Sequence, residues 1–389
     1  MKIRIKNGKV ILRDRVEENL NVYYENGFIT DVTDQELPCG EEIDAKGKYL
    51  SPGFIDIHSH GGGGADFLDG TPQAFLTAAK THARHGTTTI VPTATSCDYE
   101  GIQTLDAAWR DAVRENREGA DMPGLHLEGP YFSMNQRGAQ DPKYIRNPDP
   151  KEYEKILDST GDILRWSAAP ELPGALEFGR ELKRRGILAA IGHSDAEYPE
   201  VEAAYRAGYT HVTHLYSGMS MVHRRNAYRY AGVVESAFLI DGLTVEIIAD
   251  GKHLPAELLR LVVKFKGPDK TALITDSMRG AGMPDGPSIL GSLDKGLPVI
   301  IEDGVAKLPD RTSFAGSVAT ADLLVRNMVQ LARVSLPDAV RMASVTPANI
   351  MGFSDRGEIQ KSRRADLVLF DEEIHVSQTI VEGRTVWKA

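Results

Sequence analysis

FIDIHSH, residues 54–60, is the most informative segment for the fold, because it is a short apolar strand pattern that ends on two histidines. Four further segments repeat this design, each as a β-rich run that ends near a residue able to bind a metal. They are GLHLEGP at 124–130, LAAIGHSD at 188–195, HVTHLYSG at 211–218 and ALITDSM at 272–278. A single segment of this kind is usually structural. Together, and in this order, they indicate a hydrolytic metal centre at one end of a barrel.

Outward from residue 54, the chain contains eight β-rich runs before residue 277. They are 54–58, 87–92, 124–128, 163–168, 188–193, 211–214, 244–250 and 273–276. Helical patterns separate most of them, at 72–85, 101–118, 150–157, 175–185, 198–207 and 255–266. This alternation predicts an α/β fold, a (β/α)8 TIM-type barrel. The alternative, a doubly wound sheet, would carry a glycine-rich fingerprint that this chain lacks.

The two ends of the chain share short alternating patterns that are typical of strands. Turn signals occur at Asn7-Gly8 and Asn26-Gly27, and the tail contains ADLVLFD at 365–371 and TIVEGRTVW at 379–387. We therefore expect a small β-sandwich domain formed by residues 1–50 plus 355–389. The catalytic barrel would then span residues 51–354.

Composition restricts the class of partner. The 389 residues carry a formal net charge of −10 with a sequence pI near 5.6, which argues against nucleic-acid and anionic-membrane binding and favours small molecules. Only two cysteines occur, Cys39 and Cys97, without zinc-finger or redox spacing, so metal ligands must be His, Asp or Glu. No apolar run is long enough to span a bilayer. We expect a cytoplasmic protein.

The candidate metal ligands follow from their position on the strands. His58 and His60 are two residues apart in a strand, so their side chains share one face. The C-terminal ends of barrel strands converge on one mouth, which would bring the other candidates to the same place. These are Glu128, His193, His214 and Asp276. We expect one or two divalent ions per subunit, bridged by Glu128 if two, with Zn²⁺ first and Fe²⁺, Mn²⁺ or Co²⁺ also compatible.

In their order, these motifs resemble the amidohydrolase superfamily and, within it, the N-acetylglucosamine-6-phosphate deacetylases. The resemblance covers nearly the whole chain, from PGFIDIHSHGGGG at 52–64 to the ADLVLFD tail. It implies metal-dependent hydrolysis of the N-acetyl group of N-acetylglucosamine-6-phosphate, which gives acetate and glucosamine-6-phosphate. A carboxylate beside the metal suits the general base of this reaction, and Asp276 is the candidate.

The resemblance also implies a set of substrate-binding residues. They are Ala139, Gln140, Ser217, Gly218, Arg225, Arg229, His253, Phe314, Ala315 and Gly316. The phosphate-binding arginine maps to Arg225 or Arg229, with Arg229 favoured, although these residues and Arg224 equally fit a solvated charge run. In relatives this arginine commonly reaches the neighbouring subunit's site, so we expect a homodimer.

The sequence departs from the family pattern around the sugar pocket. Ser217-Gly218 replaces the Asn-Ala of most relatives, and Gln140 stands where relatives often have a substrate-contacting histidine. These changes leave two alternatives to the 6-phosphate substrate open, a 6-sulfated sugar and the galactosamine epimer. One lost or redirected polar contact shifts discrimination by about 1 to 3 kcal/mol, enough to change preference tenfold or more.

Three other classes of protein fit the sequence less well. A dihydroorotase or hydantoinase type would need a carboxylated lysine after the fourth strand, where WSAAPE, residues 166–171, has none. A D-aminoacylase-like enzyme would share the metal ring but would not need the arginine cluster. A degenerate barrel acting as a binding or scaffold protein would have broken ligands, whereas all six are intact here.

Overall fold

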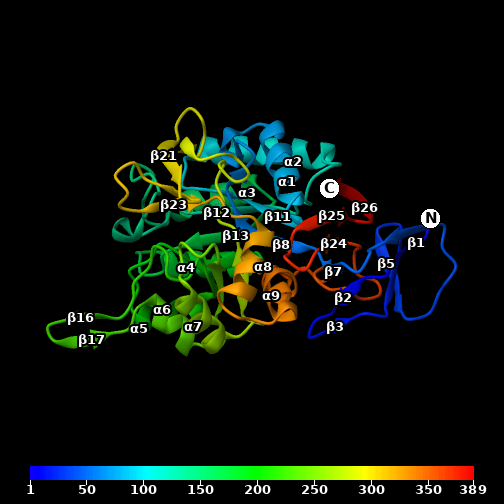
Figure 1. Cartoon of the computed structure of the whole chain (residues 1–389). Coiled ribbons are helices and arrows are strands. Elements are labelled where there is room, and N and C mark those ends of the chain that lie inside the picture. The colour runs from blue at the N-terminus through cyan, green and yellow to red at the C-terminus, as the bar shows by residue number, and fades with distance from the viewer.

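Eight parallel strands form the central sheet of the computed structural model, which describes residues 1–389. In sheet order they are β19 (Thr271–Ile274), β18 (Thr244–Ile248), β15 (Tyr209–Val212), β14 (Leu188–Ile191), β13 (Ile163–Ala168), β12 (Leu125–Glu128), β11 (Thr87–Ala94) and β8 (Phe54–Ser59). The two edge strands meet at a seam, where Asp276 N donates to the His58 carbonyl (2.9 Å) and His60 N to the Ser277 carbonyl (2.8 Å). The predicted TIM-type barrel is confirmed (Figure 1).

One α-helix follows each barrel strand. They are α1 (Pro72–Ala83), α2 (Tyr99–Glu115), α3 (Pro150–Ser159), α4 (Ala175–Arg184), α5 (Tyr198–Ala207), α6 (Val233–Leu239), α7 (Ala256–Lys266) and α8 (Ala321–Gln330). Local sequence sets several starts: the Thr71 side chain caps α1 with Pro72 at its first position, and Asp98 caps α2. Helices α9 (Leu336–Ala343) and α10 (Val345–Met351) follow. None of these helices has the length and apolar character needed to cross a membrane.

The two chain ends build a β-sandwich beside the barrel (Figure 1). One sheet has the order β5 (Phe28–Thr33), β4 (Asn21–Glu25), β1 (Ile3–Lys6) and β6 (Glu41–Asp44). The other has β26 (Arg384–Lys388), β25 (Val376–Val381), β24 (Leu367–Phe370), β7 (Tyr49–Pro52), β2 (Lys9–Ile11) and β3 (Val16–Glu17). Val22 from the first sheet and Leu369 from the second share one buried core. The division at residues 50 and 355 stays a prediction, and β7 runs across the first of these positions.

Two β-elements are absent from the sequence expectations. A four-stranded antiparallel sheet lies between β19 and α8, formed by β20 (Gly286–Leu290), β21 (Leu297–Glu302), β22 (Val305–Lys307) and β23 (Phe314–Ser317). A hairpin of β16 (His223–Arg225) and β17 (Tyr228–Tyr230) projects from the body of the barrel (Figure 1). Short elements complete the chain: β9 (Gly61–Gly62), β10 (Ala65–Asp66), η1 (Phe67–Asp69) and η2 (Met134–Gln136).

Four of the expected strands, β14, β15, β18 and β19, end two residues earlier than the sequence indicated. His193, His214 and Asp276 were expected to close their strands, but β14, β15 and β19 end two residues before them. These three residues have φ values of 47°, 27° and 45°, in the left-handed region that non-glycine residues rarely adopt. Such a residue cannot continue a strand ladder. Strained backbone of this kind concentrates at functional sites, so these three positions are candidate site residues.

Candidate metal centre

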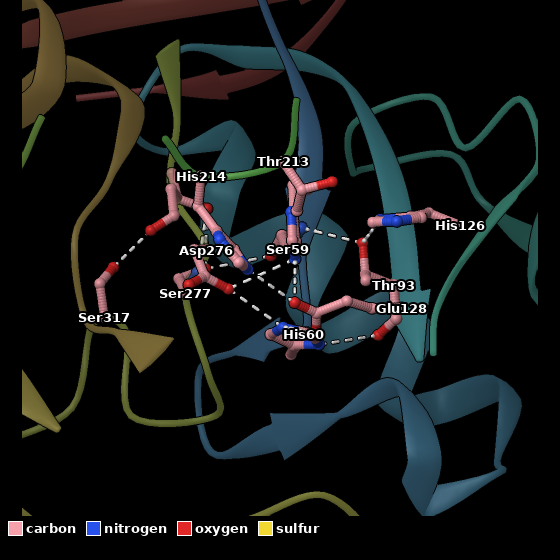
Figure 2. Close-up of polar contacts among 12 residues, drawn as sticks. Ser59, His60, Thr93, His126, Glu128, Thr213, His214, Asp276, Ser277 and Ser317 are labelled. Carbon is pink, nitrogen blue, oxygen red and sulfur yellow. Dashed lines mark hydrogen bonds and ion pairs between the residues drawn. The ribbon is translucent and has the colours of Figure 1, made fainter. Parts of the chain in front are cut away.

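The structure brings all six predicted ligands together at the C-terminal mouth of the barrel. Two groups have ligand atoms within 4.8 Å of one another, His58 with His60 and Glu128, and Glu128 with His193 and His214. Asp276 completes the ring, with Oδ1 3.0 Å from His60 Nε2 and 3.4 Å from His58 Nε2. Figure 2 shows His60, Glu128, His214 and Asp276 converging. Glu128 belongs to both groups, which is the arrangement a bridging carboxylate requires.

Each of the four histidines is oriented by a hydrogen bond at Nδ1. The partners are Glu246 Oε1 for His58 (2.8 Å), the Thr93 carbonyl for His60 (3.1 Å), the Gln136 carbonyl for His193 (2.8 Å) and the Ser217 carbonyl for His214 (3.1 Å). These oxygens only accept, so Nδ1 carries the hydrogen in each ring. All four Nε2 atoms are left to face the centre. Metal-binding histidines usually have such a partner on the other nitrogen.

His58 provides a direct test of whether a metal fits. Its Nε2 is fully buried and has no hydrogen-bond partner. The nearest carboxylate oxygens, on Asp276 and Glu128, lie at 3.4 and 3.6 Å. A buried nitrogen without a partner is costly, and a metal ion would satisfy its lone pair. Four imidazoles and two carboxylates form a donor set that suits Zn²⁺ and related divalent ions, so the residues fit the expected group.

The electrostatics of the cluster favour positive charge at its centre. Burial by itself would lower the pKa of His58, but the Asp276 and Glu128 carboxylates raise it to about 10. For Glu128 the effects are opposite in sign. Burial alone would raise its pKa, but His58 and the other neighbouring histidines hold it well below its usual range. Two buried carboxylates thus remain ionised close together. This field would attract a divalent cation.

A fully buried charged layer lies beneath the centre. Arg165 donates from two nitrogens to the two carboxylate oxygens of Glu246, at 2.6 and 2.7 Å. His211 Nε2 also lies 3.0 Å from Glu246 Oε2. Although burial would raise it, Arg165 holds the pKa of Glu246 well below its usual range. Sequence reasoning missed Arg165 and Glu246. Their signal was a single charged residue inside each apolar strand, ILRWSA and TVEII.

A cavity of about 300 Å³ opens above the ring and contains most of the predicted substrate contacts. Those that line it are Ala139, Gln140, Ser217, His253, Phe314 and Gly316. Gly218 packs behind it, where an added Cβ would lie 2.7 Å from His193 Nδ1. Ala315 is fully buried in the core of the β20–β23 sheet. No lysine or arginine lines the cavity.

His253 is held in a defined orientation at the cavity wall. Its Nδ1 lies 2.7 Å from Asp250 Oδ2, and its ring packs against Phe314 with 4.7 Å between centroids. The carboxylate oxygen accepts, so the hydrogen is on Nδ1 and Nε2 is left for another partner. Asp250 therefore orients His253.

The predicted arginines lie away from the cavity, on the β16–β17 hairpin. Arg225 bonds Glu197 at 2.9 Å, and its guanidinium stacks over Tyr230 at 4.0 Å from the ring centroid. Arg229 is exposed and bonds only the Ala227 carbonyl (3.3 Å). It stands directly opposite Arg224 in the hairpin register. Two like charges in such a pair repel each other unless an anion lies nearby.

Comparison with known proteins agrees with this geometry. The family model described as "Amidohydrolase family" matches residues 49–386. The chain belongs to the amidohydrolase family, among its N-acetylglucosamine-6-phosphate deacetylases. A Bacillus subtilis N-acetylglucosamine-6-phosphate deacetylase is 34% identical over 387 residues, covering 97% of this chain and 96% of its own. An N-acetylgalactosamine-6-phosphate deacetylase of Escherichia coli O157:H7 is 33% identical over 340 residues, with 87% of each chain covered.

Solved structures give the same family. A Mycobacterium smegmatis N-acetylglucosamine-6-phosphate deacetylase mutant, in complex with N-acetyl-D-glucosamine-6-phosphate, aligns over 99% of both chains with a TM-score of 0.90 and 30% identity. The Thermotoga maritima enzyme aligns over 99% of this chain and 100% of its own, with a TM-score of 0.88 and 32% identity. The resemblance predicted from the motifs is confirmed. Amidohydrolases are metal-dependent hydrolases, and this member has the residues to hold a metal.

Replacing Glu246 by Gln tests the layer beneath the centre. His58 would lose its charged partner and Arg165 would lose its buried counter-charge. We expect zinc affinity to fall about 10- to 100-fold, as for other partners of metal-binding histidines. Competition titration of zinc against a chelator measures this. Glu154→Gln, on an exposed face of α3, is the control, and equal zinc affinity in both variants would contradict the role given to Glu246.

Proposed function

We propose that this amidohydrolase removes the acetyl group of N-acetylglucosamine-6-phosphate and yields acetate and glucosamine-6-phosphate. The observation that carries the proposal is the ring of four Nε2-directed histidines around Glu128, set in a barrel shared with deacetylases of that substrate. The proposed ligands are His58, His60, Glu128, His193, His214 and Asp276. One or two divalent ions would bind there, with Zn²⁺ our first choice and Fe²⁺, Mn²⁺ or Co²⁺ as alternatives.

In the proposed reaction, Asp276 moves the proton. A divalent ion bound at the ring would lower the pKa of the attacking water and polarise the acetyl carbonyl. Asp276 lines the cavity and lies beside His58 and His60, so it is placed to take the proton of the attacking water. It would then return that proton to the amine as the C–N bond breaks. A positioned acid–base group of this kind contributes about 10²- to 10⁴-fold to the rate.

The cavity wall would hold the sugar. His253, fixed by Asp250, offers Nε2 to a sugar hydroxyl or, when doubly protonated, to the acetyl carbonyl. Phe314 and Gly316 close the same wall from the β20–β23 sheet. The cavity of this chain does not by itself explain phosphate binding, because no lysine or arginine lines it.

We propose that the phosphate is bound by an arginine from a second copy of the chain, in a homodimer. The β16–β17 hairpin projects from the barrel and carries Arg224 and Arg229 opposite each other without any carboxylate partner (Figure 1). Arg225 is already paired with Glu197, which favours Arg229 as the phosphate ligand. Ala139, Gln140 and Ser217 stay in the proposed substrate site, and Gly218 and Ala315 would shape its wall from behind. A cytoplasmic location is also proposed, in keeping with the two unpaired cysteines.

Acetate release from a panel of sugars tests the proposed substrate. The panel contains N-acetylglucosamine with a 6-phosphate, a 6-sulfate or a free 6-hydroxyl, and N-acetylgalactosamine-6-phosphate. We expect the highest kcat/KM of zinc-loaded enzyme with N-acetylglucosamine-6-phosphate. A higher value with the sulfate or with the galactosamine epimer would assign a different substrate, and absence of activity on all four would overturn the proposal.

Replacing Asp276 by Asn tests the general base. Metal should still bind, because the four histidines and Glu128 remain. We expect kcat to fall by about 10²- to 10⁴-fold, since the amide cannot carry the proton. Measured kcat at saturating zinc, with zinc content determined on the same sample, checks this. Asp285→Asn, at an exposed position, is the matched control. Near-normal turnover of Asp276→Asn would contradict the role of Asp276 as the general base.

Replacing Arg229 by Ala tests the shared arginine. We expect KM for the 6-phosphate substrate to rise about tenfold or more, because a charge-assisted hydrogen bond contributes about 1.5 to 3 kcal/mol. KM for N-acetylglucosamine should not change, since it carries no anion. Arg180→Ala, an exposed arginine on α4, is the control. An equal effect on both substrates, or a monomeric wild-type protein in solution, would contradict the shared site.

A further inference from the structure

Gln140 makes two hydrogen bonds that fix the orientation of its amide. Its Oε1 accepts from Ser96 N at 2.8 Å, and its Nε2 donates to Glu128 Oε2 at 2.7 Å. A backbone N–H can only donate and an ionised carboxylate can only accept, so both contacts require the same assignment of oxygen and nitrogen. The side chain is only 5% exposed. It therefore links the segment after β11 to the end of β12.

The backbone around Gln140 is also held in place. Gln140 N donates to the Arg137 carbonyl at 2.9 Å, and Arg137 Nη1 donates to the Gln140 carbonyl at 3.1 Å. Gly138, two residues earlier, has a φ of 54°, so the loop turns sharply just before it returns to the metal centre. The amide is thus presented to Glu128 from a braced loop.

Glu128 needs such a contact, because the terminal torsion of a glutamate is soft. Its Oε1 lies 2.9 Å from His214 Nε2 and 3.1 Å from His193 Nε2. Its Oε2 faces His60, whose Nε2 lies at 3.4 Å, whereas His58 Nε2 lies 3.6 Å from Oε1. The bond from Gln140 to Oε2 is the shortest hydrogen bond the carboxylate makes. It prevents the carboxylate from rotating and keeps Oε1 directed at His193 and His214.

We propose that Gln140 is a positioning residue that orients Glu128 as a metal ligand, and that this role outweighs any contact with substrate. The inference rests on the metal centre of the proposed function. It assigns to Gln140 the hydrogen bond that holds a metal-binding carboxylate in one rotamer. Because it concerns the binding of metal alone, it can fail or hold independently of which sugar is hydrolysed.

The test is zinc and cobalt binding to Gln140→Leu, which removes both hydrogen bonds at similar volume. Apo protein is titrated with zinc against a chelator, and the visible spectrum of the Co²⁺ form is recorded as a report on ligand geometry. We expect the tightest zinc site to weaken about tenfold or more, as for other residues that orient metal ligands, with a changed Co²⁺ spectrum. Gln103→Leu is the matched control and should change neither, because this half-buried residue of α2 bonds Ser159 and Thr160 and lines neither the metal ring nor the cavity.

Kinetics at saturating zinc separate positioning from substrate contact. A positioning role predicts that most lost activity of Gln140→Leu returns as zinc is raised, with KM near the wild-type value. Zinc affinity and Co²⁺ spectrum equal to wild type, together with a raised KM, would overturn the inference. If Gln140→Leu does not fold, Gln140→Met removes the same donor from an unbranched chain of similar length, and the same results are expected of it.

Discussion

The structure depends on keeping two ionised carboxylates, Glu128 and Asp276, buried side by side at the mouth of the barrel. Buried charge is tolerated only when it is paired and hydrogen-bonded. Here four imidazoles, each held by a hydrogen bond at Nδ1, surround the carboxylates with their Nε2 atoms facing inward. The oxygens that accept from Nδ1 hold these imidazoles in place. One of those oxygens belongs to Glu246, which is itself paired with Arg165. A divalent cation at the centre would complete the neutralisation.

The fold meets this requirement at the ends of its strands. Glu128 is the last residue of β12, while His193, His214 and Asp276 follow their strands in left-handed conformations. Those conformations turn the side chains inward across the mouth. At the seam between β8 and β19, the hydrogen bonds that join the edges come from the ligand segments themselves. The hydrogen bonds that close the barrel therefore also bring part of the site together.

The barrel and the six candidate ligands could be predicted from sequence because each rests on a local pattern. Alternating strands and helices have clear periods, and an HxH motif places two side chains on one face whatever surrounds them. The terminal β-strands were also visible as short alternating runs. Their pairing across the ends of the chain, β24 with β7, follows from the barrel returning the chain to its start.

Other features depend on contacts between distant residues, which no local pattern encodes. Glu246 reads as one charge in an apolar strand until His58 and Arg165 are placed against it. Gln140 was predicted only as a substrate contact, whereas its bond to Glu128 appears once the loop folds back. The β20–β23 sheet escaped prediction because its strands are short and partly exposed. In the proposed homodimer, the choice of phosphate-binding arginine would likewise depend on contacts between the two copies.

The most direct test of the metal centre is anomalous diffraction at the zinc edge from crystals of the zinc-loaded protein. We predict one or two peaks, with the first within bonding distance of Glu128 Oε1 and the Nε2 atoms of His193 and His214. A second, if present, would lie beside His58 and His60. Zinc peaks only elsewhere on the protein, with none at Glu128, would contradict the account.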